Sequence, residues 1–397
     1  MKKIKPAYVY LISIFTVIVV ACIYIFSGSA YTTTRNTSEN SKLDGMIWDM
    51  PPDTMSEQWR IDNVQGLINS LGQPVVFFDK EIRGLNSQDG SEKWSYKTNS
   101  RICDAVDSAN TIVALMDKGQ GCNSIVQLEA ATGKLLHTAE YANDHTESKL
   151  IAQSNFIAVV TKNNMRLLRN SDLVETTFFG DKTDPLYKEE NKYKDCTISD
   201  VTMSTDNVAI AAMCYNTAMN KMEENYNIKI MEAEPKDSNQ PVEILNVDSG
   251  SKDPVTLPII TKAMIEFIIQ GDAPSGYIWE VTKGKEMVDS FTVNYGEYGF
   301  PYKDFGGIGY LWRVGNTLNL RYGSEDLVNP YTINGAIGNP MQASDYVIVP
   351  MRDKIVAWNP RIGIHKETSI PGFIGREFAF SGGTIMSLYE GTVVAYR

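Results

Sequence analysis

Histidine and cysteine are scarce in this 397-residue chain, which has three of the first and five of the second. His137, His145 and His365 form no metal-ligand spacing, and no Cys-x-x-Cys pair occurs, so the sequence offers no zinc site. Gly-x-Ser-x-Gly and His-Glu-x-x-His motifs are also missing, which excludes the usual hydrolase and metalloprotease signatures. We therefore expect that the chain is not an enzyme and binds no cofactor or metal.

Charge is missing from residues 7–26, which are about as long as the 20 residues that span a hydrocarbon core of roughly 30 Å. Lys2, Lys3 and Lys5 precede this stretch, and the next basic residue is Arg35. The positive-inside rule then places the N-terminus in the cytoplasm and the folded part outside. We predict a cytoplasmic tail (1–6), a single-pass signal anchor in the plasma membrane (7–27) and an extracytoplasmic stalk rich in Thr, Ser, Asn and Pro (28–57).

Two other interpretations of the N-terminus stay open. A cleaved secretory signal would have a shorter apolar region, and 27–30 is a weak cleavage site. Residues 19–22 resemble a bacterial lipobox in which Cys22 is acylated, although the residues after Cys22 remain apolar. All three interpretations export the remainder of the chain.

The exported part is acidic. The net charge of the whole chain is −11, and the three lysines are the only charges before residue 30, so the remainder has a formal charge of −14. Such a domain is repelled by nucleic acid and by anionic lipid headgroups. We expect no nucleic-acid partner.

A short phrase recurs along the chain: an apolar run, a polar turn, a second apolar run, and a turn with Gly or Asp. The fullest copies are 76–90 and 125–134, and their turns Asp89-Gly90 and Thr132-Gly133 lie 43 residues apart. β-Branched and aromatic runs bounded by such turns favour hairpins, and the period matches a four-stranded propeller blade. Residues 58–397 are therefore predicted to be an all-β propeller with seven blades, or alternatively eight.

The two ends of the predicted propeller are expected to meet. The chain stops at Arg397, before the last blade has received its outer strand. Residues 58–61 precede the first full blade and can supply that strand, which would leave no free edge there.

Four cysteines fall into two similar intervals, Cys103 to Cys122 and Cys196 to Cys214. An even number at repeated spacing in an exported protein indicates disulfides. We predict one bond within each of two blades, at equivalent places, with metal binding as the alternative.

Residues 85–94 and 128–134 resemble the repeat of pyrroloquinoline-quinone-like propellers, whose blades typically end in Leu-Asp-Ala-x-Thr-Gly-Lys-x-x-Trp. The likeness implies that Gly90 and Gly133 turn the chain between one blade and the next and that Trp94 packs between sheets. These are structural roles. Quinone-dependent dehydrogenases of this superfamily use adjacent cysteines and a calcium-binding cluster, and neither appears here.

Two non-enzymatic groups of such propellers are similar to this chain in layout: the BamB type, which are scaffolds in outer-membrane assembly, and actinobacterial single-span envelope propellers of the PgfA type. The resemblance implies an accessory factor for an envelope-assembly or lipid-export complex, with trehalose mycolates as one class of lipid. A ligand-binding or sensory ectodomain is the alternative, and a quinone-dependent oxidoreductase is a third hypothesis.

One stretch lacks strand alternation and is rich in aromatic residues. It is interpreted either as blade-to-blade core or as an apolar patch that contacts a lipid tail or a partner peptide. Its members are Phe291, Tyr295, Tyr298, Phe300, Tyr302 and Phe305.

Overall fold

A computed structural model describes residues 34–37 and 52–397 with internal gaps. The gaps are residues 120, 142–146, 154, 181–192, 217–218, 237–241, 261–263, 270–274, 281–286, 293–302, 306–308, 315–316, 322–330, 338–339, 344–345, 360–363 and 375–376. Several strands between 258 and 365 are described by their backbone alone.

The apolar runs form strands, and some of them are buried on both faces. Gln73–Phe77 and Phe156–Val160 are buried at every position, although a strand with one wet face would alternate. Both faces are covered because each sheet packs between two others. The core is accordingly divided into clusters that lie between neighbouring sheets, such as the cluster that contains Val75, Ile112 and Val126.

The described strands pair into eight antiparallel sheets built on four strands each. The first four contain β3 (Gly66–Ser70), β4 (Gln73–Phe77), β5 (Glu81–Leu85), β6 (Glu92–Lys97); β7 (Arg101–Ser108), β8 (Thr111–Asp117), β9 (Cys122–Glu129), β10 (Leu135–Glu140); β11 (Lys149–Gln153), β12 (Phe156–Val160), β13 (Asn164–Arg169), β14 (Glu175–Gly180); and β15 (Tyr193–Met203), β16 (Asn207–Asn216), β18 (Asn227–Glu232), β19 (Glu243–Asp248). A short β17 (Lys221–Met222) pairs with the end of β16.

The other four sheets follow the same order. They contain β20 (Val255–Ile260), β21 (Met264–Ile269), β22 (Ser275–Glu280), β23 (Met287–Thr292); β24 (Lys303–Phe305), β25 (Gly309–Val314), β26 (Thr317–Arg321), β27 (Tyr331–Asn334); β28 (Met341–Ala343), β29 (Tyr346–Met351), β30 (Lys354–Asn359), β31 (Ile364–Ser369); and β32 (Glu377–Ser381), β33 (Thr384–Tyr389), β34 (Thr392–Tyr396), β2 (Glu57–Ile61).

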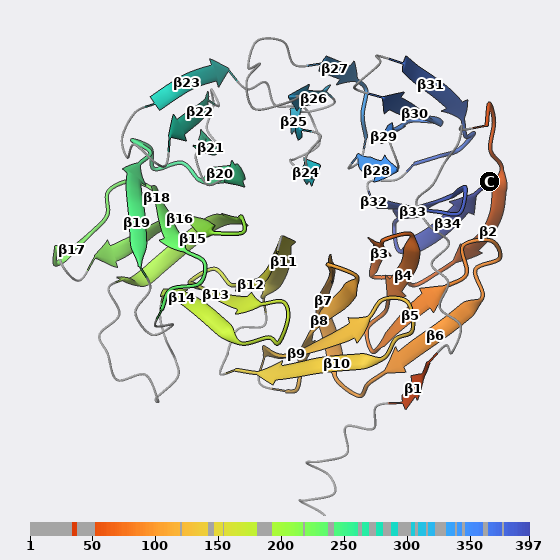
Figure 1. Cartoon of the computed structure of the whole chain (residues 1–397), viewed down its shortest axis with the longest axis horizontal. Coiled ribbons are helices and arrows are strands. Elements are labelled where there is room, and N and C mark those ends of the chain that lie inside the picture. The colour runs from red at the N-terminus through yellow and green to blue at the C-terminus, as the bar shows by residue number, and fades with distance from the viewer. Residues whose placement is uncertain are drawn as a thin grey trace, which may run out of the picture.

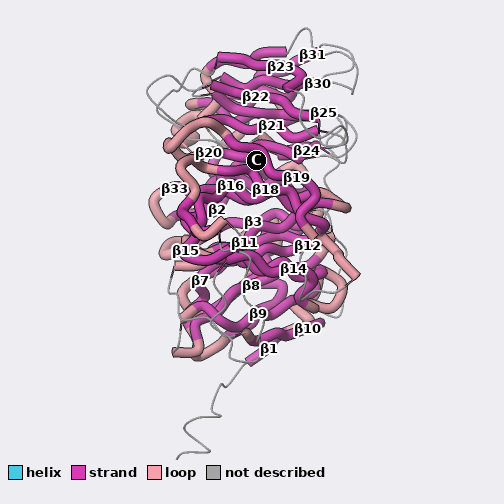
Figure 2. The backbone as a smooth tube through the Cα atoms, turned by 90° about the vertical axis from the view of Figure 1, so that its left-hand side faces the viewer, coloured by secondary structure: helices cyan, strands magenta, loops and turns pink. Residues whose placement is uncertain are grey.

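The sheets stand around a ring with their first strands innermost and their fourth strands on the outside (Figure 1). Contacts between first strands run from β32 to β3, β7, β11, β15 and β20. Seen edge-on, the ring is a single layer of sheets (Figure 2). The predicted all-β propeller is confirmed, and the described strands pair into eight sheets.

The two ends of the chain close the ring, as predicted. β2 pairs antiparallel with β34 as the outer strand of the last sheet. Ser56 and Arg397 exchange two backbone hydrogen bonds of 3.0 Å each, and the amide of Met55 donates to the carbonyl of Ser369 on the preceding sheet at 2.9 Å. Met55 is itself buried between those two sheets. The segment that contains Met55 and β2 therefore completes the last sheet and also bonds it to the preceding sheet.

A further strand lies within the range expected as stalk. β1 (Thr34–Asn36) pairs antiparallel with the outer edge of β6, with Thr34 opposite Lys97 and Asn36 opposite Ser95. The sheet β3–β6 thereby gains a fifth strand, which lies on the outside of the ring (Figure 1).

The glycine and tryptophan positions of the repeat join consecutive sheets. Trp94, on the fourth strand β6, is fully buried, and its indole N–H donates to the carbonyl of Ala130 in the next sheet at 2.9 Å. Trp59 on β2 bonds the carbonyl of Ser87 in the same way at 3.1 Å. The predicted packing of Trp94 between sheets is confirmed. The predicted position of the glycine turns is wrong: Gly90 and Gly133 lie between the third and fourth strands of one sheet, where the Trp of the preceding sheet rests on them.

We expect Gly133→Ala to destabilise the ring by about 1–3 kcal/mol, because a methyl group there would lie 2.5 Å from Cε3 of Trp94 and force the indole to move. Thermal unfolding followed by tryptophan fluorescence measures it. Gly250→Ala is the matched control, since its φ of 71° is nearly the 70° of Gly133 but its surroundings are open. Equal losses in the two variants would mean that backbone strain alone, and not the contact with Trp94, is responsible.

Candidate functional site

Both predicted disulfides are present: Cys103–Cys122 and Cys196–Cys214 each lie within one sheet. The prediction that they occupy equivalent places is wrong. The first joins β7 to β9 across the end of β8, whereas the second joins the adjacent strands β15 and β16. The reason is the length of β16, which has ten residues against seven in β8 and so takes Cys214 into the second strand.

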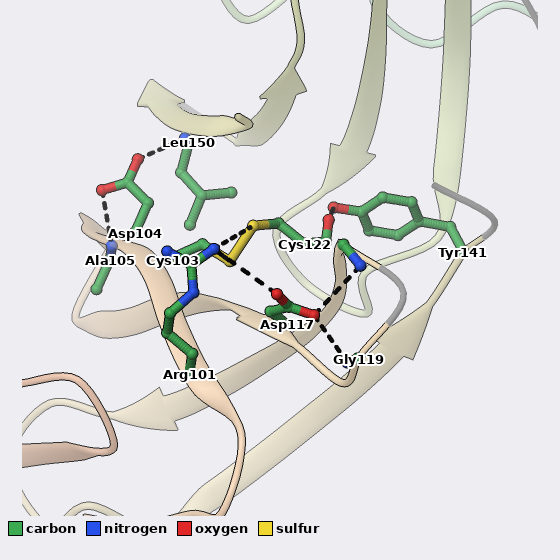
Figure 3. The surroundings of a disulfide bond; sticks show 10 residues. Arg101, Cys103, Asp104, Ala105, Asp117, Gly119, Cys122, Tyr141 and Leu150 are labelled. Atoms are coloured by element: carbon green, nitrogen blue, oxygen red, sulfur yellow. Dashed lines mark hydrogen bonds and ion pairs between the residues drawn. A yellow bond between two sulfur atoms is a disulfide. The ribbon is translucent and has the colours of Figure 1, made fainter. Parts of the chain in front are cut away.

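The first disulfide lies beside a small polar network (Figure 3). The guanidinium of Arg101 is 3.9 Å from the sulfur of Cys122 and 3.7 Å from the carboxylate of Asp117. Asp117 also accepts the amide of Gly119 at 2.7 Å, which fixes the turn after β8. The Tyr141 hydroxyl donates to the carbonyl of Cys122 at 3.2 Å.

Two aspartates tie neighbouring sheets together. Asp104 on β7 accepts the amide of Ala105 at 2.8 Å and that of Leu150, on the first strand of the next sheet, at 2.7 Å (Figure 3). Asp200 on β15 repeats this arrangement with Val201 and with Leu257 on β20, both at 2.9 Å. Each aspartate directly follows a β-bulge, which turns the carboxylate toward the next sheet. We call Asp104 and Asp200 the inter-sheet clamps.

Other inner strands use related bonds. Gln153, the last residue of β11, accepts the amide of Met203, the last residue of β15, at 3.3 Å. The hydroxyl of Ser199 donates to the carbonyl of Val255 at 2.7 Å. The ends of β11 and β15 therefore lie together, and Ser199 and then Asp200 bond residues of β20 in the same order, so these neighbouring first strands point in the same direction.

Burial raises the pKa of both clamp carboxyls above the usual range for aspartate, although the two backbone amides at each one and Lys149 act in the opposite direction. Burial also raises the pKa of Glu377, on the first strand β32, and the nearby charge of Asp104 adds to this effect. Carboxylates on the inner strands are thus held in surroundings that disfavour their charge.

We expect Asp200→Asn to change the dependence of stability on pH. Because the folded-state pKa lies above the unfolded value, the folded protein holds this proton more tightly. The contribution of Asp200 is therefore complete below about pH 4 and declines as pH rises through the folded-state pKa. The variant has no such decline, so its deficit relative to wild type should be larger at pH 4 than at pH 8. Urea unfolding across this range measures it, with the exposed Asp206→Asn as control; a deficit independent of pH would contradict the expectation.

Two buried cations lie on third strands. Arg166 pairs with Glu175 at 2.5 Å and stacks on Tyr141 and Phe178 at 5.1 and 5.0 Å. Lys229 has no exposed surface, pairs with Glu223 at 2.5 Å and lies 4.5 Å from the centre of the Tyr193 ring. Each cation is neutralised and covered by an aromatic ring, which fits a structural ion pair within a sheet interface.

Exposed apolar side chains occur at both ends of the sheets, and three of them share one end in consecutive sheets. The first disulfide lies where β7 begins and the second where β15 begins, so we call that end of the ring the disulfide face and the other the opposite face. The turns between third and fourth strands lie at the opposite face. Beside these turns, in three consecutive sheets, are Leu136, Val174 and Val242, with exposed fractions of 39, 50 and 43%. We call these three residues the apolar rim.

Most of the apolar patch expected from the sequence lies outside the described residues. Phe291 and Phe305 are placed by their backbone on β23 and β24, while Tyr295, Tyr298, Phe300 and Tyr302 lie outside the described residues. Cys22 and the expected anchor lie outside them as well. In the part of the chain that is described, no helix is long and apolar enough to cross a membrane, and no group of His, Cys, Asp and Glu is arranged to hold a metal ion.

Neither the inter-sheet clamps nor the apolar rim was predicted from the sequence, and the reasons differ. Both clamps are an Asp after a polar or cysteine residue within a first strand, in Cys-Asp-Ala-Val and Ser-Asp-Val-Thr. An alignment of the predicted blades on these two aspartates, and not on the cysteines, would have identified the inter-sheet clamps. Single apolar residues beside turns carry no such signal, because isolated exposed side chains of this kind are common.

Comparison with known proteins supports the fold. No family model and no curated protein matches the sequence. Among solved structures, Sqt1 of Saccharomyces cerevisiae is similar with a TM-score of 0.53 at 10% identity, over 87% of this chain and 99% of that one. At such low identity the similarity concerns the fold alone.

Two bacterial structures are similar at lower scores. BamB from Moraxella catarrhalis gives a TM-score of 0.48 at 11% identity, over 87% of this chain and 100% of that one. PorZ, an essential surface component of the type-IX secretion system of Porphyromonas gingivalis, gives 0.44 at 12% identity, over 84% of this chain and 43% of PorZ.

Proposed function

We propose that this chain is a membrane-anchored, extracytoplasmic propeller that serves as a non-enzymatic scaffold for a protein complex of the cell envelope. The observation that carries the location is the pair of disulfides, because structural disulfides persist in oxidising compartments outside the cytoplasm. The uncharged residues 7–26 supply the anchor in this proposal.

The buried polar side chains support the role of scaffold, because their hydrogen bonds and ion pairs are made within the ring. The buried carboxylates at the inner strands bond the backbone of the next sheet, and the buried cations are paired within the sheet interfaces. These groups hold the ring together. We infer that each of the eight sheets is one blade, so the ring has eight.

The apolar rim is the surface that we assign to the partner. Leu136, Val174 and Val242 protrude at the same end of three consecutive sheets, and buried apolar anchors dominate the energy of protein interfaces. The partner we propose is an integral-membrane or envelope protein, in a complex for either envelope assembly or lipid export.

Affinity purification of the cross-linked full-length protein from its native membranes tests this role. We expect one integral-membrane or envelope protein to be retained specifically, and to be lost when Leu136, Val174 and Val242 are all changed to serine. The matched control changes Ile374, Tyr389 and Met222 to serine, since these apolar residues are exposed to a similar degree but lie at the disulfide face. No retained envelope protein, or equal retention by both triple variants, would contradict the proposal.

A further inference from the structure

The strand β1 limits how far the propeller can be from the membrane. β1 begins at Thr34, which lies opposite Lys97 at the end of β6. Burial raises the pKa of Tyr96 while the charge of Arg35 lowers it, which agrees with Arg35 lying next to that buried ring. The start of β1 is therefore fixed to one place on the outer border of the ring.

The chain available between that place and the apolar stretch is short. Only residues 27–33 separate residue 26 from Thr34, and seven residues can span at most about 24 Å at about 3.4 Å each. A compact domain of this size has a radius of gyration of about 20 Å, so the far side of the ring lies much farther away than the tether can reach.

We propose that the outer edge of the sheet β3–β6, at its Lys97 end, is the part of the propeller nearest the lipid bilayer, with the rest of the ring projecting away from the membrane. This inference rests on the proposed anchor. In both views β1 lies at the end of the molecule remote from β23 and β31, which then project furthest from the membrane (Figures 1 and 2).

Electrostatics favours a ring that projects over a ring that lies flat. The exported part carries a formal charge of −14, so contact of a whole face with anionic headgroups is repulsive. Thr34 lies at the disulfide-face end of β6, because β6 ends there, so the apolar rim at the opposite face remains open to a partner.

Energy transfer to the membrane surface tests the orientation. The full-length protein carries Cys22→Ser, so that a single introduced cysteine takes the donor dye while the other four cysteines remain in disulfides. The protein is placed in vesicles of phosphatidylcholine and phosphatidylglycerol with acceptor-labelled headgroups. Donor sites are Lys97→Cys, near β1, and two exposed distant sites: Arg352→Cys, in the sheet that contains β31, and Val242→Cys at the opposite face.

We expect transfer to be highest from position 97 and lower from both distant positions. Replacing residues 34–36 by three prolines removes every backbone N–H of β1 and should detach it, which reduces the difference between sites, whereas three alanines keep the pairing and the difference. Equal transfer from all three positions, or no effect of the three prolines, overturns the orientation. Flotation with the vesicles separates the two proposals: protein that floats without a preferred site refutes the orientation alone, and protein that fails to float refutes the anchor and the orientation together.

Discussion

Deletion of residues 392–397 is expected to abolish the cooperative unfolding transition of the propeller. The deletion removes β34, which lies between β33 and β2, so both neighbours lose their ladder partner. It also removes Val393, Ala395 and Tyr396 from two core clusters in which they are buried. Loss of one large buried aromatic costs about 3–5 kcal/mol, and a domain is stable by only about 5–15 kcal/mol. Thermal unfolding followed by circular dichroism measures the effect.

The matched control replaces residues 34–36 by Gly-Ser-Gly. It disrupts β1, which also pairs at a sheet edge, but the sheet β3–β6 keeps its own four strands. We expect a decrease in Tm much smaller than that caused by the deletion. If the deletion variant unfolds at the wild-type temperature, the ring is not closed by pairing of the two ends.

Removal of either disulfide is expected to lower the free energy of unfolding by about 3 kcal/mol, because each bond closes a loop of 18 or 19 residues in the unfolded chain. The double variants Cys103→Ala/Cys122→Ala and Cys196→Ala/Cys214→Ala each delete both sulfurs of one bond, so that neither partner is left as a free thiol. Their midpoints in urea, compared with wild type in the absence of reductant, measure the loss.

Two controls make this test specific. Cys22→Ser should leave the midpoint unchanged. Reductant should lower the stability of wild type but should not affect a quadruple variant that combines the two double variants and so lacks both disulfides. Unchanged midpoints in the two double variants would show that the bonds do not contribute to stability under these conditions.

The repeat in the sequence was sufficient to predict the class of fold, because apolar runs that alternate with Gly or Asp turns favour consecutive β-hairpins. Val76, Ile125 and Val347 all lie in buried strands of the expected hairpins. The closing strand 58–61 was predictable for a related reason, since a blade with three strands has an edge that must be paired.

The count and the internal register were harder to predict. Division by an average blade length cannot separate seven from eight when turns vary in length and β16 is longer than β8. The cysteine spacing suggested equivalence because 19 and 18 residues are nearly equal, yet the same separation joins first to third strands in one sheet and first to second in the other. Separation along the chain does not determine position across a sheet.

The candidate sites depended on contacts between segments far apart in sequence. Asp104 meets Leu150 and Asp200 meets Leu257 only because a bulge turns the carboxylate toward the next first strand. The assignment of Gly90 and Gly133 to turns between blades failed for a similar reason. Gly90 and Gly133 lie in turns within one sheet, but each contacts a tryptophan of the preceding sheet, Trp59 or Trp94. These turns are therefore part of the interface between two neighbouring sheets.

Counting free thiols in intact cells tests the central claim, an exported and disulfide-bonded propeller, most directly. Cells are quenched in acid, denatured without reductant, and treated with a maleimide that adds a large mass to each free cysteine. We expect that at most Cys22 reacts, since the other four of the five cysteines are paired. Modification of all five in freshly quenched cells would place the chain in a reducing compartment and contradict the account.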